Sequence, residues 1–330
     1  SYIMRIARKW VSPPYNVDGW RLDVAADLGH SPEYNHDFWR KFRENVRAVN
    51  PDALILAEHY GDPEAWLEGD QWDSVMNYDA FMEPVTWFLT GLEKHSDEYR
   101  QDMYRNADAF FGAMRHYMTS FHTQSLMVAM NELSNHDHSR FMTRTNHRVG
   151  RIGSSGPEAA NYDLNPAIMR EAVVIQMTWI GAPTIYYGDE AGVCGWTDPD
   201  NRRTYPWGSE DKELIRLHKE MIAIHKSYQA LKTGSIKFVY GAYGVIGYGR
   251  FTEDEQFVIL VNNNDYEVNV EVPVWELGVD AEKPLARMLY TNVDGFGVDY
   301  VPYFAEDGIL SMRLWPFSSI VLKNYPDHLM

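Results

Sequence analysis

The stretch DGWRLDVAADLG, residues 18–29, places an arginine and an aspartate at the end of a short apolar run. Arg21 and Asp23 are two residues apart, so their side chains point to the same face if the run is a strand. A guanidinium beside a carboxylate holds that carboxylate ionised, which is the state that a nucleophile requires. We therefore predict a strand that ends at a reactive carboxylate.

Composition limits the classes of partner. The 330 residues are 45% hydrophobic and 14% aromatic, enough for one large domain and a smaller one. The net charge of −17 argues against nucleic acid and anionic membranes, since both require a basic surface. Eleven Trp and twenty-one Tyr serve either as core residues or as stacking surfaces for sugar rings. The single cysteine, Cys194, excludes an intrachain disulfide.

The first ten residues, SYIMRIARKW, have apolar side chains at helical spacing and no signal-peptide pattern. We therefore expect the chain to begin partway through a domain. The compartment stays unknown, with one cysteine and no visible signal favouring the cytoplasm over secretion. No run of about 18 apolar residues suggests a membrane span.

Strands alternate with helices over the first two thirds of the chain, which predicts a parallel α/β sheet. The predicted strands end near residues 23, 59, 78, 137 and 190. The predicted helices cover 1–11, 34–49, 62–69, a long stretch 80–118, 166–180 and 210–231, with a loop at 151–165. From about residue 232 short alternating runs and turn signals predict a small all-β sandwich, so the expected domains are 1–231 and 232–330.

Three of these strand ends carry charged clusters: Arg21/Asp23, Glu58/His59 and Asn135/His136/Asp137. Parallel strands direct their carboxyl ends to one face, where α/β barrels place their chemistry. A single acid after a strand is usually a solvated loop residue. Three such clusters at strand ends instead predict one site built from three carboxylates.

Four segments, in order, make the pattern specific: VDGWRLDVA, LAEHYGD, LSNHDHSR and APTIYYGDE. They resemble the strand-four, strand-five, strand-seven and strand-eight signatures of the α-amylase family of glycoside hydrolases. The loop GWTDPDNRRTYPW resembles the neopullulanase/cyclomaltodextrinase-like branch of that family. The resemblance implies a (β/α)8 TIM barrel, of which this chain holds strands four to eight, followed by the family's C-terminal β-sandwich.

The same resemblance implies roles for the clustered residues. Asp23 matches the nucleophile, Glu58 the general acid/base and Asp137 the acid that stabilises the transition state. Arg21 would keep Asp23 ionised, and His136 would contact the hydroxyls of the sugar in the cleavage subsite.

The remaining candidates lie in loops. Asp198 and Arg202 match a pair that contacts the sugar one subsite further in, and with Trp196 they define a loop expected to govern which glucans fit. A salt bridge that braces the loop is the alternative for Asp198 and Arg202. His59 stands where the family usually has an aliphatic residue, and it either contacts substrate on the leaving-group side or packs against the strand end.

The family's barrel begins with three strands that this chain lacks, and the Asn-His motif, the inserted domain and most calcium ligands would lie there. The pair Asn146-His147 cannot replace that motif because a polar loop, TRTNHRVG, surrounds it. We therefore expect the C-terminal part of a longer enzyme, inactive alone, whose open barrel edges pair with another chain or with the upstream half. No cofactor or metal is expected in residues 1–330, and calcium would belong to the upstream part.

The chemistry fits these residue types. Cleaving an acetal requires one protonated carboxyl group to donate to the leaving oxygen and one ionised carboxylate to attack the anomeric carbon. We therefore predict a retaining hydrolase of α-1,4-glucans such as starch, maltooligosaccharides, cyclodextrin or pullulan, with α-1,6 bonds as further candidates. The alternatives are an α-glucosidase or transglycosylase of the same family and, from another class, a non-catalytic carbohydrate-binding fragment.

Overall fold

The computed structural model describes residues 1–324, and five parallel strands follow one another along the first 184 of them. Strands β1, β2 and β3 form one sheet, and β4 and β5 form a pair. A parallel bridge between Met76 and Met130 connects β3 to β4, so the strands neighbour one another in chain order. The strands are β1 (Gly19–Leu22), β2 (Leu54–Ala57), β3 (Ser74–Val75), β4 (Met130–Glu132) and β5 (Ala182–Thr184).

Helical segments separate these strands, as the α/β pattern predicts. They are α1 (Tyr2–Trp10), α2 (Pro32–Arg47), α3 (Glu83–Thr90), α4 (Ala107–Met118), α5 (Thr123–Met127), α6 (Phe141–Arg144), α7 (Ile152–Ser155), α8 (Pro166–Thr178), α9 (Lys212–Ser227) and α10 (Gln229–Thr233). No helix among residues 1–324 is long and apolar enough to cross a bilayer.

Helix α2 shows how local sequence determines these elements. The Ser31 side chain accepts a hydrogen bond from Tyr34 N at 3.2 Å, and Pro32 occupies the first turn, where a missing N–H costs nothing. Trp39, Phe42 and Val46 recur at helical spacing and are buried against the sheet. This stripe fixes the face that α2 turns toward β1 and β2.

Two sequence predictions are wrong in detail. The stretch 80–118 is not one helix, because α3 ends at Gly91 in the left-handed region (φ 70°) and a loop separates it from α4. The expected strand 126–137 starts as the end of helix α5, and β4 covers only Met130–Glu132. The loop 151–165 contains the short helix α7.

Residues 235–324 are mainly antiparallel β structure. The strands are β6 (Ser235–Ala242), β7 (Val245–Phe251), β8 (Gln256–Asn262), β9 (Val268–Pro273), β10 (Leu285–Asn292), β11 (Gly295–Gly297), β12 (Pro302–Tyr303), β13 (Ile309–Leu314) and β14 (Ser318–Asn324). Seven of them form one sheet, in the order β11-β10-β14-β8-β7-β6 with β12 beside β10, and β9 pairs with β13. Apolar residues of both sheets, including Val258, Val272 and Leu310, share one buried cluster.

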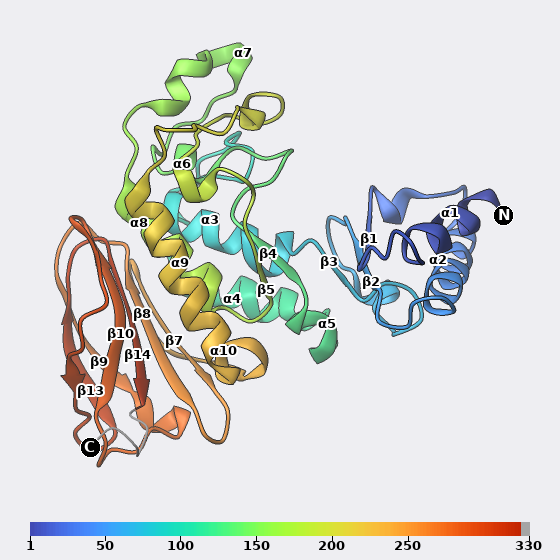
Figure 1. The fold of residues 1–330 in the computed structure, drawn as a ribbon. Coiled ribbons are helices and arrows are strands. Elements are labelled where there is room, and N and C mark those ends of the chain that lie inside the picture. The colour runs from blue at the N-terminus through green and yellow to red at the C-terminus, as the bar shows by residue number, and fades with distance from the viewer. Residues whose placement is uncertain (325–330) are drawn as a thin grey trace.

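The β-rich part packs against the helices through a common core. Figure 1 shows α8 and α10 beside the C-terminal strands, with α1 and α2 at the opposite end of the molecule. Trp179, just after α8, is fully buried, and its ring centroid lies 5.6 Å from Phe110, 5.6 Å from Phe238 and 4.8 Å from Tyr248. These partners belong to α4, β6 and β7. Aromatic contacts therefore hold the two parts together.

Replacing Trp179 should weaken the packing between the helices and the C-terminal strands. We expect Trp179→Ala to lower the free energy of unfolding by about 3–5 kcal/mol, because a large buried ring leaves a cavity. Trp275, which is 60% exposed, is the control, and Trp275→Ala should change stability by about 0.5 kcal/mol or less. Urea unfolding followed by circular dichroism measures both variants. An unaltered midpoint for Trp179→Ala would contradict a shared core.

Candidate active site

Asp23 and Glu58 follow the carboxyl ends of the neighbouring strands β1 and β2. Leu22 pairs with Ala57 in the parallel register, so Asp23 and Glu58 are the next residues on neighbouring strands. Arg21 lies between them: its Nη1 is 2.5 Å from Asp23 Oδ1 and its Nη2 is 3.3 Å from Glu58 Oε2. Arg21 and Asp23 thus contact each other, although β1 ends at Leu22 and Asp23 lies in the turn that follows it.

The turn after β1 also holds Glu58. Val24 has φ 45°, in the left-handed region, and its backbone N–H donates to Glu58 Oε2 at 3.0 Å. A β-branched residue rarely adopts this conformation, and such strain collects at functional sites. The side chain of Glu58 is 9% exposed whereas that of Asp23 is 77% exposed. The two carboxylates therefore sit in different environments beside one cation.

The electrostatics follow from these contacts. The hydrogen bond from Arg21 is the main cause that lowers the pKa of Asp23. The charges of Arg21 and His136 lower this pKa further. Burial works to lower the pKa of Arg21, but the hydrogen bond to Asp23 and the charge of Glu58 outweigh it and raise that pKa. Asp23 is thus held as a carboxylate, as the sequence predicts.

The third carboxylate, Asp137, lies in the loop after β4. Asn135 Oδ1 accepts hydrogen bonds from the backbone N–H groups of Asp137 at 2.9 Å and His138 at 3.1 Å, which closes a tight turn. His136 Nε2 is 3.4 Å from Asp137 Oδ2, and the charge of His136 acts on Asp23. The charges of Asp137 and Glu58 both act on Tyr60. The structure therefore brings the three predicted clusters together.

The loop 195–207 packs onto this turn. Arg202 Nε donates to Asp198 Oδ1 at 2.8 Å and to the His136 carbonyl at 3.1 Å, and its Nη2 is 3.8 Å from Asp137 Oδ1. Asn201 Nδ2 donates to the carbonyls of Asn135 at 3.0 Å and His138 at 2.7 Å. Asp198 and Arg202 form the bracing salt bridge, and Arg202 also faces Asp137.

Two predicted substrate contacts are not supported by their positions. Trp196 is 1% exposed, and its Nε1 donates to the Gly156 carbonyl at 2.9 Å, so the ring packs the loop and offers no free face. The His59 ring lies 5.0 Å from Trp66 and 5.9 Å from Trp72. His59 Nε2 also bonds to the Asp62 carbonyl at 3.0 Å, so this residue packs against the strand end.

The sequence analysis missed an aromatic group at the site. Tyr60 stacks on Tyr78 at 4.6 Å, and its hydroxyl is 3.2 Å from His138 Nε2. Burial, reinforced by the charges of Glu58 and Asp137, raises the pKa of Tyr60 to about 12. Lys94 Nζ lies 5.5 Å from the centre of this ring. The tyrosine directly after Glu58-His59 in the sequence was the available signal for this group.

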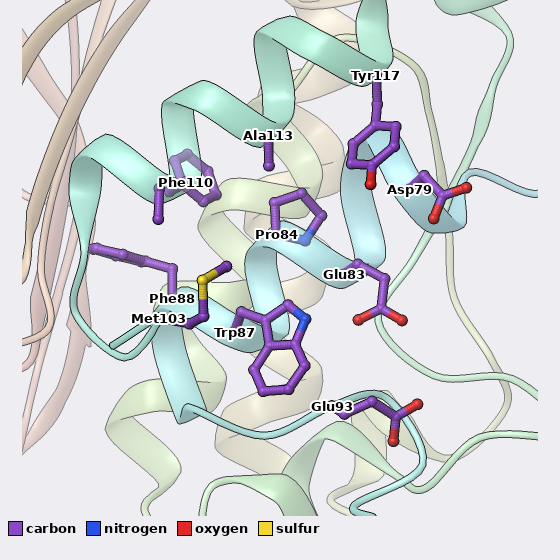
Figure 2. Close-up of a pocket in the computed structure, with 11 residues that line it drawn as sticks. Asp79, Glu83, Pro84, Trp87, Phe88, Glu93, Met103, Phe110, Ala113 and Tyr117 are labelled. Carbon is purple, nitrogen blue, oxygen red and sulfur yellow. The ribbon is translucent and has the colours of Figure 1, made fainter. Parts of the chain in front are cut away.

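A cavity of about 270 Å3 lies beside this group, between α3 and α4. In Figure 2, Phe110, Ala113 and Tyr117 of α4 face Pro84 and Trp87 of α3, while Asp79, Glu83 and Glu93 provide acidic groups. Asp79 Oδ2 accepts from Gly61 N at 2.8 Å, which joins the cavity wall to the loop after Glu58. Glu83 forms an ion pair with Lys94. The carboxylates of Asp79 and Glu83 therefore already have partners within the protein.

One group of three metal-type donors occurs among the described residues 1–324: Glu93, His95 and Asp97, with ligand atoms within 4.8 Å of one another. Burial opposes ionisation of Glu93, but the hydrogen bond and charge of His95 outweigh it and lower its pKa to about 2. Lys94 Nζ is 3.6 Å from Glu93 Oε1, and Arg151 Nε donates to Asp97 at 2.6 Å. Protein cations therefore pair with both carboxylates of this group.

Known proteins are similar to this chain in sequence and in architecture. Residues 1–234 match the family model described as alpha amylase, catalytic domain. Neopullulanase 2 of Thermoactinomyces vulgaris is 33% identical over 327 residues, which cover 98% of this chain and 48% of the relative. Cyclomaltodextrinase of Thermoanaerobacter pseudethanolicus is 34% identical over 265 residues, 80% of this chain and 40% of the relative. The chain thus spans about half the length, or less, of these curated relatives.

A solved structure is also similar to this chain. The native debranching enzyme of Nostoc punctiforme superposes with a TM-score of 0.77 at 28% identity, covering 97% of this chain and 60% of that one. The similarity therefore extends through the C-terminal strands.

The Arg21 contact makes a prediction about Asp23. Arg21→Met should raise the pKa of the Asp23 carboxyl toward its ordinary value, because the donor that favours the ionised form is gone. Carboxyl-carbon NMR titration measures this directly. Arg40→Met, which removes the exposed 2.6 Å pair with Asp70, is the matched control and should leave Asp23 unaffected. An Asp23 titration that is identical in wild type and Arg21→Met would remove Arg21 as the cause.

Proposed function

The chain belongs to the α-amylase family, and we propose that the natural protein containing it is a retaining glycoside hydrolase of α-1,4-linked glucans. The observation that carries the proposal is the position of Arg21, whose guanidinium contacts the carboxylates of Asp23 and Glu58 at adjacent strand ends. A retaining mechanism requires two carboxyl groups beside the glycosidic bond that is cleaved, one ionised and one protonated.

Asp23 acts as the nucleophile in this proposal. Its lowered pKa and high exposure support attack on the anomeric carbon, which forms a glycosyl-aspartate while the bond to the leaving oxygen breaks. Glu58 donates its proton to that oxygen. It then takes a proton from an incoming water, whose oxygen bonds to the anomeric carbon while the bond from that carbon to Asp23 breaks. Asp137 stabilises the positive charge that develops on the sugar, and His136 contacts the hydroxyls of that sugar. Asp198 and Arg202 contact the sugar one subsite further in.

We place β1–β5 as strands four to eight of the family's (β/α)8 barrel and the chain from residue 232 as its β-sandwich domain. The parallel order of the five strands supports this assignment, as do the charged clusters that follow three of them. The names of the relatives, neopullulanase, cyclomaltodextrinase and amylopullulanase, support a starch-type α-glucan as substrate and keep α-1,6 bonds as candidates.

Asp23→Asn should abolish turnover while substrate binding largely survives. The amide keeps the shape of the side chain but cannot form the glycosyl intermediate, so kcat on maltotriose should fall at least about a thousandfold. Asp27→Asn, an exposed aspartate four residues on, should keep near-normal kcat. The complete natural protein is assayed for kcat, with maltotriose binding measured by calorimetry. More than about a tenth of wild-type kcat would remove Asp23 from this role.

Glu58→Gln should separate natural from activated substrates. An α-glucosyl fluoride needs no proton for departure, so the intermediate should still form rapidly, whereas hydrolysis of maltotriose should fall by about a hundredfold or more. Stopped-flow release of fluoride measures the first step. Glu64→Gln, an exposed glutamate of the same loop, is the control. Equal losses on both substrates would contradict the acid/base assignment.

A further inference from the structure

Glu132 is a buried acid beneath the site that has no role in the mechanism above. It is the last residue of β4 and is 2% exposed. Met130, two residues earlier on the same face, packs against the cluster of Leu56, Met76 and Tyr78 from β2 and β3. Glu132 therefore projects from β4 toward the same sheet-enclosed region as Arg21, whose charge acts on it.

The contacts of Glu132 lead to the catalytic turn. Glu132 Oε1 accepts a hydrogen bond from Asn135 Nδ2 at 3.0 Å. The other end of the Asn135 amide accepts the backbone N–H groups of Asp137 and His138. The Asn135 amide therefore faces an acceptor, Glu132 Oε1, with its nitrogen and two backbone donors with its oxygen. Only one of the two flipped orientations of the amide satisfies all three hydrogen bonds.

We propose that Glu132 is a positioning residue that fixes the Asn135 side chain and, through it, the backbone turn that presents His136 and Asp137. The inference rests on the proposed function for its effect on activity. A carboxyl group suits this task because it keeps an oxygen that accepts from the N–H end of the amide in both of its charge states. Tyr78 Oη, 3.2 Å from Asn135 Nδ2, is both donor and acceptor and does not impose that orientation.

The charge state of Glu132 links this arrangement to pH. Burial raises the pKa of Glu132 to about 8, which the hydrogen bond from Asn135 and the charge of Arg21 oppose. The titratable and charged groups that face Glu132 come from five segments: Arg21, Tyr60, Tyr78, Asp137 and Asp189. Above that pH an ionised Glu132 repels Asp137 and Asp189, and it competes with Asp23 and Glu58 for the charge of Arg21.

Two substitutions separate the hydrogen bond from the charge. Glu132→Gln keeps an acceptor oxygen and cannot ionise, whereas Glu132→Leu removes the acceptor at similar volume. In the complete natural protein at pH 6.5, we expect kcat/KM on maltotriose to stay within about threefold for Glu132→Gln and to fall about thirtyfold for Glu132→Leu. From pH 8 to 9.5 the wild type should lose activity more steeply than Glu132→Gln.

Glu171→Gln is the matched control. Glu171 is also a buried glutamate whose pKa is raised by burial, but it lies on α8, and its described contacts do not include the site. This variant should keep the wild-type pH profile. Equal losses for Glu132→Gln and Glu132→Leu, wild-type activity in Glu132→Leu, or a shifted profile in Glu171→Gln would each overturn the proposal.

A readout independent of activity tests the positioning itself. Hydrogen exchange at the backbone amides of Asp137 and His138 should speed up about tenfold in Glu132→Leu and stay near wild type in Glu132→Gln, because only the first releases the Asn135 amide. Unchanged exchange in Glu132→Leu refutes the positioning role. Altered exchange together with a wild type that cleaves no α-glucan refutes the proposed function and supports the positioning role.

Discussion

The site depends on one ion-pair arrangement, in which the Arg21 guanidinium lies between carboxylates of two neighbouring strands. Its Nη2 is also 3.3 Å from Met76 Sδ, so the side chain contacts groups that follow β1, β2 and β3. A planar cation with donors on several edges can hold two carboxylates at fixed angles, which a lysine cannot do. Asp23 then remains ionised while exposed to solvent, and Glu58 stays largely buried beside it.

The parts of this arrangement that the sequence predicts are those governed by local rules. The two-residue spacing of Arg21 and Asp23 fixes their common face in any strand, and charged residues after apolar runs mark the carboxyl ends of parallel strands. Helix α2 follows from its N-cap and from the spacing of its apolar residues. The assignment of catalytic roles remains a prediction, because it concerns chemistry and not placement.

Tertiary packing decides the features that the sequence analysis missed. Trp196 has the residue type of a sugar-stacking surface, yet its burial depends on Gly156, forty residues away. The helix expected over 80–118 is broken at Gly91, whose added Cβ would lie 2.5 Å from the Tyr99 ring. Glu132 gave no signal because a buried acid within an apolar strand looks like a surface position until the enclosing strands are known.

The hydrogen bonds of the Asn201 side chain constrain which substitutions this protein can accept during evolution. By donating to the carbonyls of Asn135 and His138, it fastens the 195–207 loop to the turn that carries Asp137. A substitution in either segment therefore acts on a shared hydrogen-bond network, and residues in one network combine non-additively. Variation in the two segments should be strongly epistatic: changes acquired together can preserve the fit that either change alone would disturb, so new substrate preferences would arise most readily through paired replacements.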